Sequence, residues 1–148
     1  MKKFKFPLKK MRDYKEQLLE NEKGTLMKLI ADRDEAYARM NELKASFNML
    51  NNELGEKIKV GIAVMQIKIY EYRKDNIRSD QEQTQIRINI IEGAIERQRR
   101  VVVLLNQEIS GLNKLEEKQR AEYDAAVMKE NENMISEFIV QKLAGEAT

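Results

Sequence analysis

An apolar stripe with alternating spacings of three and four residues runs through most of this chain, and it limits what the chain can form more than any other feature. In the first half the stripe contains Ala36, Met40, Leu43, Phe47, Leu50 and Leu54. In the second half it contains Ile88, Ile91, Ile95, Gln98, Val102, Leu105, Ile109 and Leu112. Such spacing averages about 3.5 residues, which is the period of a coiled coil. Because most of the apolar residues lie on one narrow seam, few remain to enclose a pocket. We therefore predict an all-α protein that works by contact with other proteins.

The composition excludes most kinds of active site. The 148 residues include one Pro, six Gly, no His, no Cys and no Trp, and 35% of them are charged, which is typical of long exposed helices. Without His and Cys, the chain lacks the commonest zinc ligands, the usual general base and the thiol nucleophile. Neither G-x-x-x-x-G-K-[ST] nor G-x-G-x-x-G occurs, so the common phosphate-binding loops are missing. We therefore predict no enzymatic activity, no cofactor and no metal site.

The charge and hydropathy patterns limit the kinds of partner that the chain can be expected to bind. The net charge is +2, from 27 basic and 25 acidic residues whose signs are mixed along the chain, and this does not predict nucleic-acid binding. The longest apolar runs, such as 101–105, fall far short of the roughly 20 residues that a membrane span needs. The N-terminus has lysines but no apolar core of a secretory signal. These features predict a cytoplasmic protein with no direct membrane span.

Two segments are candidates for the point where the chain turns back. Residues 55–61 carry two glycines, and glycine is the usual helix terminator. Residues 73–82 lack apolar side chains except Ile77, and Ser79 to Glu82 has the spacing of a capping box. Between the two, apolar residues continue the helical pattern at Ile62, Met65, Ile69 and Tyr72.

The C-terminal third bears on the same question. Beyond Leu112 the stripe turns polar, with Glu116, Gln119, Tyr123, Ala126, Glu130 and Asn133 in the same register. A seam this polar no longer has a full apolar partner. A turn near Gly61 would bring the first helix to its end opposite about residue 110, leaving a helical overhang of roughly 30 residues, or about 40 Å.

Both ends of the chain carry candidate partner surfaces. The lysine-rich start holds Phe4 and Phe6, which suit either contact with an acidic or anionic-lipid surface or simple packing at a solvated helix start. Pro7 fits a helix that begins near residues 4–8. Near the other end, an apolar group lies where the seam has turned polar, and it suits either docking in a partner's groove or self-association. This group contains Met134, Ile135, Phe138, Ile139 and Val140.

Three segments of the chain together resemble a known family. The opening Phe4-Lys5-Phe6-Pro7-Leu8-Lys9-Lys10-Met11-Arg12-Asp13-Tyr14 is similar to the start of the FliJ family, the small coiled-coil component of the bacterial flagellar type III export apparatus. Gly61-Ile62-Ala63, followed by Tyr70 and Tyr72, resembles its glycine-led turn. Residues 115–123 and 129–134 resemble its closing helix, although Glu132-Asn133 stands where the family commonly has Asp-Glu.

The resemblance implies a fold and a role. It implies an antiparallel two-helix coiled coil, a long α-hairpin with a C-terminal helix overhang, and it favours the turn near Gly61. We accordingly expect a single hairpin over 1–148, with helix 1 at about 5–56, a turn at about 57–62, helix 2 at about 63–141 and a disordered tail at 142–148. It further implies a stalk-like protein that inserts into the ring of the export ATPase FliI, links it to the gate protein FlhA, and escorts export chaperones or substrates at the inner face of the cell membrane.

The same resemblance implies two sets of partner-binding residues. The gate contact, on one face of helix 2 after the turn, would use Arg73, Ile77, Asp80 and Thr84. The contact with the ATPase ring would use Phe4, Phe6, Met134, Ile135 and Phe138. The alternative to an export stalk is a generic structural coiled coil, either an adaptor or a parallel dimeric scaffold.

Overall fold

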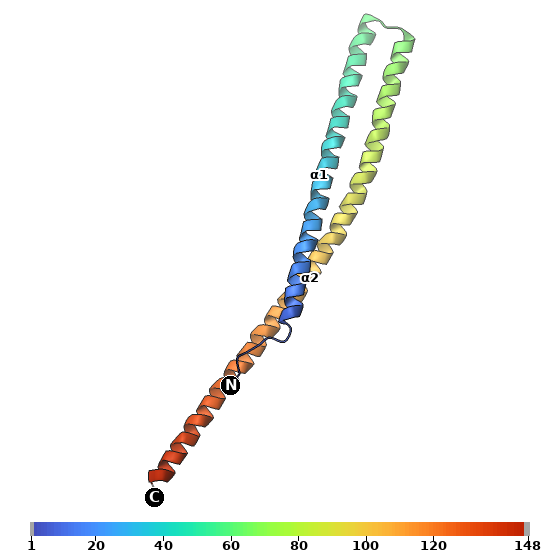
Figure 1. The fold of residues 1–148 in the computed structure, drawn as a ribbon. Coiled ribbons are helices and arrows are strands. Elements are labelled where there is room, and N and C mark those ends of the chain that lie inside the picture. The colour runs from blue at the N-terminus through green and yellow to red at the C-terminus, as the bar shows by residue number, and fades with distance from the viewer. Residues whose placement is uncertain (1, 147–148) are drawn as a thin grey trace. The chain divides into compact units, whose positions relative to one another are not determined.

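The structure is a computed structural model that describes residues 2–146. It contains two helices, α1 (Lys9–Val60) and α2 (Val64–Glu146), joined by residues 61–63 (Figure 1). The chain forms two compact units. One, the hairpin unit, is Asn21–Val102; the other, the terminal unit, combines the residues up to Glu20 with those from Val103 onward. Each pairs a stretch of α1 with an antiparallel stretch of α2, so the chain pairs with itself, as the all-α hairpin prediction requires.

The helix bounds differ from the expected ones at every end except the start of α2. α1 begins at Lys9 rather than near residue 5, because Pro7 lies in a turn ahead of the helix instead of in its first turn. It ends at Val60 rather than near residue 56. α2 continues to Glu146, so residues 142–146 of the predicted disordered tail are helical, and no proline interrupts them. The last two residues of that predicted tail lie outside the described residues.

The turn depends on the backbone of Gly61. Its φ of 95° lies in the region that L-residues rarely adopt and glycine tolerates. The Gly61 N–H donates to the carbonyls of Lys57 (3.0 Å) and Ile58 (3.2 Å), which closes the end of α1. The Ala63 carbonyl then accepts the N–H of Gln66 at 3.0 Å and so opens α2. The alternative turn at 73–82 lies inside α2.

Two apolar clusters hold the hairpin unit together. The first contains Ala36, Met40, Ile88, Ile91 and Ile95, with Leu26, Leu29 and Ile30 packed against it. The second contains Leu50, Leu54 and Tyr70, with Ile62, Ile67 and Ile77 packed against it. The first cluster joins the stripes read from the two halves of the sequence, and Ile88 is completely shielded from water. The second joins the first-half stripe to Tyr70, which the second-half stripe does not include. Full burial of a Leu, Ile or Met side chain in these clusters stabilises the pairing by roughly 1.5–3 kcal/mol.

The seam close to the turn is not the one expected. Met65, Ile69 and Tyr72 are exposed, and Tyr70 and Lys74 occupy the buried positions instead. The Lys74 ammonium donates to the side-chain oxygen of Asn51 at 3.0 Å and of Glu71 at 3.3 Å. It also lies 5.5 Å from the centre of the Phe47 ring. The aliphatic stem of a lysine can fill an apolar seam while its charged end finds polar partners at the rim.

In the terminal unit, ion pairs join α1 to α2 beside a short apolar seam. Leu19, Leu105 and Ile109 are buried there. The Lys15 ammonium donates to the Glu108 carboxylate at 2.6 Å, and Arg12 forms an ion pair with Glu116. The side chains of these two pairs are 16–37% exposed, so water still reaches the charges and each pair contributes modestly to stability.

The N-terminal segment, residues 2–8, is not helical and lies back along α2 (Figure 1). The Phe4 ring lies 5.7 Å from the Tyr123 ring, and the Arg120 guanidinium lies 5.0 Å from the Phe4 ring centre. The Tyr123 hydroxyl donates to the carbonyl of Lys2. The sequence predicts that the first helix ends opposite about residue 110. The non-helical residues 2–8 extend the contact with α2 further, as far as Tyr123. Beyond it, every residue from Met128 to Glu146 is exposed.

Candidate partner-binding surfaces

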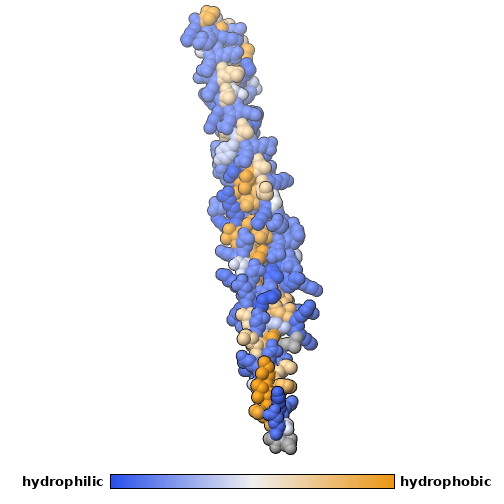
Figure 2. Space-filling model, turned by 90° about the vertical axis from the view of Figure 1, so that its left-hand side faces the viewer, coloured by the Kyte–Doolittle hydropathy of each residue, from blue (hydrophilic) through white to orange (hydrophobic). Residues whose placement is uncertain are grey.

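The C-terminal stretch of α2 presents an apolar face without a covering element among the described residues. Its members are Met128, Met134, Ile135, Phe138, Ile139 and Leu143. At 100° per residue these side chains fall within about half of the helix circumference, so they form one face, whereas Val140 points away from it. We call these six residues the C-terminal apolar face, and Figure 2 shows hydrophobic surface in this part of the molecule. An amphipathic helix of this kind can dock in a hydrophobic groove.

The residues predicted to contact the ATPase ring are divided between two environments. Met134, Ile135 and Phe138 are exposed, at 60–66% of their full surface, and lie on the C-terminal apolar face. Phe6 is buried, with the Arg12 guanidinium 5.3 Å from its ring centre, and Phe4 packs on Tyr123. Tyr123 precedes Met134 by about three helical turns, or roughly 16 Å along α2. The two phenylalanines therefore belong to the packing of the terminal unit.

The C-terminal apolar face contains two residues that are not among the sequence-predicted ones, Met128 and Leu143. The signal was present, because Met128, Ile135 and Ile139 recur at spacings of seven and four residues. The apolar stripe is hard to recognise in the sequence because two polar residues, Asn131 and Lys142, lie on the same side of the helix.

The residues predicted to contact the export gate lie on one side of α2 in the hairpin unit, but they are not equally accessible. Ile77 is half-buried against the cluster of Leu50, Leu54 and Tyr70. The Thr84 hydroxyl is half-buried and donates to the Asp80 carbonyl at 2.7 Å. Arg73 and Asp80 are exposed, and the Arg73 guanidinium lies 5.8 Å from the Tyr70 ring centre. A partner approaching this side would meet the two charged groups first.

A depression beside Asp80 and Thr84 is lined by arginine. Arg39 of α1 and Arg87 of α2 complete its wall, together with Gln83. The two guanidinium groups make this part of the hairpin unit suited to a carboxylate of a partner protein.

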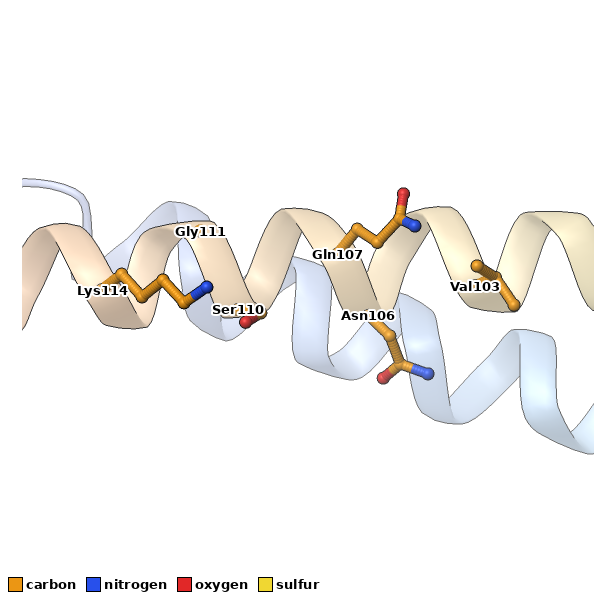
Figure 3. Close-up of a pocket in the computed structure, with 6 residues that line it drawn as sticks. All are labelled: Val103, Asn106, Gln107, Ser110, Gly111 and Lys114. Atoms are coloured by element: carbon orange, nitrogen blue, oxygen red, sulfur yellow. The ribbon is translucent and has the colours of Figure 1, made fainter.

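A second depression runs along α2 in the terminal unit, as Figure 3 shows. Val103, Asn106, Gln107, Ser110, Gly111 and Lys114 line it. All of them are exposed, so no polar group there is shielded from water. A site of this kind can contact a partner surface but lacks the desolvated environment that shifts pKa values for acid–base catalysis.

Two titratable groups in the hairpin unit have shifted pKa values. The Tyr37 hydroxyl donates to the Glu92 carboxylate, and this hydrogen bond raises the pKa of Tyr37 above its ordinary value. The contact with Tyr70, whose ring centre lies 5.1 Å from the ammonium, raises the pKa of Lys57. Both groups are at the surface, so these shifts reflect pairing across the hairpin rather than an active site.

The described residues contain no group of three carboxylates arranged to hold a metal ion. In the same part of the chain, neither helix includes a stretch long and apolar enough to cross a lipid bilayer.

Comparison with known proteins identifies the family. The family described as Flagellar FliJ protein matches residues 4–147, which is nearly the whole chain. No curated protein and no solved structure matches it at a significant level. The match covers both helices, the turn between them and the exposed C-terminal stretch of α2. The chain therefore belongs to the FliJ family and is a component of the flagellar export apparatus.

Proposed function

We propose that this protein is a stalk-like component that binds the export ATPase FliI, links its ring to the gate protein FlhA, and escorts export chaperones or substrates. It acts in the cytoplasm, peripherally at the inner face of the cell membrane. The chain supplies no chemistry of its own in this role. It changes the activity of the ring by binding some subunit conformations more tightly than others, because only differential binding shifts an equilibrium between states.

The exposure of the C-terminal apolar face is the observation that carries this proposal. A monomeric protein rarely leaves a contiguous apolar surface open to water unless a partner covers it. Ile135 and Ile139, which are 60% and 51% exposed, lie one helical turn apart near the middle of the face. These two side chains are the anchors that would enter a groove of the ATPase.

The test is the ATP hydrolysis rate of purified FliI with increasing amounts of this protein. We expect the rate and the fraction of hexamer to rise, and we expect Ile135→Asp/Ile139→Asp to abolish the rise. Ile86→Asp/Ile90→Asp is the matched control, because Ile86 and Ile90 are 60% and 65% exposed on α2 in the hairpin unit. This control should stimulate like the natural protein. A hydrolysis rate unchanged at every concentration would refute the contact with the ATPase.

The contact with the gate rests on the exposed charges of Arg73 and Asp80. Their conversion to alanine removes two surface charges without opening the core, since both side chains are exposed. We expect Arg73→Ala/Asp80→Ala to weaken binding to the cytoplasmic domain of FlhA about tenfold or more, as loss of a hydrogen-bonded charge at an interface does. Glu96→Ala/Arg99→Ala is the control on another side of the hairpin unit, and equal loss in both variants would contradict the assignment.

A further inference from the structure

We propose that the tip of the hairpin unit docks on an anionic lipid surface. Its exposed aliphatic side chains enter that surface, and the lysines beside them contact the phosphate headgroups. This inference deepens the peripheral location proposed above and rests on it. The tip consists of residues 57–69, the last turn of α1, the connection at 61–63 and the first turns of α2. Figure 2 shows hydrophobic surface at this end of the hairpin unit.

The tip exposes more aliphatic surface than a helix end needs. Val60 is 89% exposed, and Val64 and Met65 are each 68% exposed. Ile58 and Ile69 are also exposed, at 50% and 52%. Val60, Ile62 and Gln66 line a depression between the two helix ends together with Glu56 and Lys57. An apolar surface at the end of a hairpin, where no further turn of helix can cover it, is available to a partner outside the chain.

The charge of the tip selects the partner. Residues 57–69 contain Lys57, Lys59 and Lys68 and no acidic residue. The acidic residues on either side, Glu56 and Glu71, form ion pairs with Lys59 (3.2 Å) and Lys74 (3.3 Å). The Glu56–Lys59 pair is about three-quarters exposed, so it is weak and can yield to a phosphate. The tip is therefore a cationic end that complements a negative surface.

The residue types favour a lipid surface over a protein groove. The cores of protein interfaces are enriched in aromatic residues and arginine and depleted in lysine. Residues 57–69 differ in both respects, with lysine as the sole cation and no aromatic ring. Branched aliphatic side chains flanked by lysines suit the boundary between headgroups and acyl chains, where the aliphatic groups enter and the lysine stems reach outward.

The position of Tyr72 limits the depth of insertion. Tyr72 is 68% exposed and follows Val64 by about two turns, or roughly 12 Å along α2. Tyrosine is enriched at the level of the headgroups, and interfacial helices enter the membrane boundary by about 5–10 Å. The last carbonyls of α1 and the first N–H groups of α2 need water or headgroups as partners, which also excludes deep insertion.

The first test is flotation of the purified protein with vesicles of phosphatidylcholine alone or with phosphatidylglycerol added. We expect binding to the anionic vesicles only. Lys59→Gln/Lys68→Gln should reduce it about tenfold or more, since each lysine near an anionic surface is worth roughly fivefold. Lys28→Gln/Lys44→Gln is the control, because both of these lysines are exposed on α1 away from the tip. Val60→Asp/Val64→Asp should abolish binding, and Ile86→Asp/Ile90→Asp should not.

A second measurement reports insertion at the tip itself. The chain contains no cysteine, so a polarity-sensitive fluorophore can be attached at a single introduced site. We expect a blue shift on adding anionic vesicles with the dye at Val64→Cys and none at Ile86→Cys. Circular dichroism shows whether each variant keeps its helices.

Three results would overturn the inference. The first is failure of the natural protein to bind anionic vesicles, which would assign the tip to a protein partner. The second is equal binding by the tip variants and the natural protein, which would assign membrane contact to the lysine-rich N-terminus. The third is a dye at position 64 that does not shift. None of these assays contains the ATPase, so their failure is distinct from failure of the ATPase contact.

Discussion

Ile88 is the largest fully buried side chain among the described residues. It is 0% exposed and lies among Ala36, Met40, Ile91 and Ile95. Ile88→Ala should lower the free energy of unfolding by about 2–5 kcal/mol, because the lost methylene groups leave a cavity between two helices that can close only partly. Ile90→Ala removes the same atoms from a side chain that is 65% exposed, and should change stability by less than about 0.5 kcal/mol.

Urea unfolding followed by circular dichroism would measure both variants. A similar small loss in the two would contradict the assignment of Ile88 to the centre of the core, and would mean that the seam is loosely packed at this point.

Tyr37 and Glu92 make a pH-dependent contact across the hairpin. The Glu92 carboxylate accepts the hydrogen bond of the neutral phenol and repels the phenolate, which raises the pKa of Tyr37 above the ordinary 10.0. A pKa that is higher in the folded state contributes stability at pH values below the unfolded pKa, and this contribution is lost as the pH rises through the folded pKa. The pair should therefore support the fold at neutral pH and cease to do so above about pH 10.

Glu92→Gln should lower the pKa of Tyr37, because it removes the negative charge that opposes ionisation. Ultraviolet titration of the phenolate, with Tyr37→Phe subtracted to isolate this ring, would measure the change. A titration curve that is identical with and without Glu92 would show that the two side chains are not paired in solution.

At the scale of the elements, the turn between α1 and α2 depends on one backbone conformation. Gly61 has a φ of 95°, and an added Cβ would meet open space there, so any penalty comes from the backbone alone. Gly61→Ala should destabilise the hairpin by about 1–2 kcal/mol. Gly55→Ala, in the helical part of α1 with equally open surroundings, should instead stabilise it by about 0.5–1 kcal/mol.

Thermal unfolding should show a lower midpoint temperature for Gly61→Ala and a higher one for Gly55→Ala than for the natural protein. If both substitutions raised the midpoint, the chain would continue as a helix through residue 61 and the turn would lie elsewhere.

Much of the helix pairing can be predicted from the sequence, because the buried residues of a coiled coil repeat at a fixed spacing of three and four. The residues at Ile88, Ile91 and Ile95 repeat at three and four, and the structure buries all of them. Near the turn the same reasoning fails, because two neighbouring faces of α2 are both apolar. The face with Met65 and Ile69 looks as suitable as the face with Tyr70, and the presence of Lys74 on the latter makes it look less suitable.

The predicted helix start near residue 5 is wrong for a different reason. The ring of Phe4 packs against Tyr123 and Arg120, which are more than a hundred residues away in sequence. No local pattern signals such a contact. The surface sites share this limitation: the sequence predicts exposed apolar groups, but which of two possible faces is left uncovered depends on where the opposite helix ends.

At the scale of the molecule, the C-terminal stretch of α2 should be dispensable for folding. Every residue from Met128 to Glu146 is exposed, so its removal uncovers no core. Deleting residues 128–148 should change the free energy of unfolding of the remainder by less than about 1 kcal/mol, while stimulation of the ATPase is lost. Urea unfolding and the hydrolysis assay, performed on the same sample, would separate the two effects. A truncated protein that fails to fold would show that this stretch takes part in the structure of the free chain.

The chain doubles back once on itself, and one distance tests this most directly. Ser46 and Ser79 are exposed and adjoin Phe47 and Arg78, which contact each other across the hairpin. With a spin label at each position and an excess of unlabelled protein, electron paramagnetic resonance should give a separation of about 10–20 Å, as expected for side-by-side helices. A separation of about 50 Å, which 33 residues of unbroken helix would span, would contradict the hairpin and indicate a parallel assembly of separate chains.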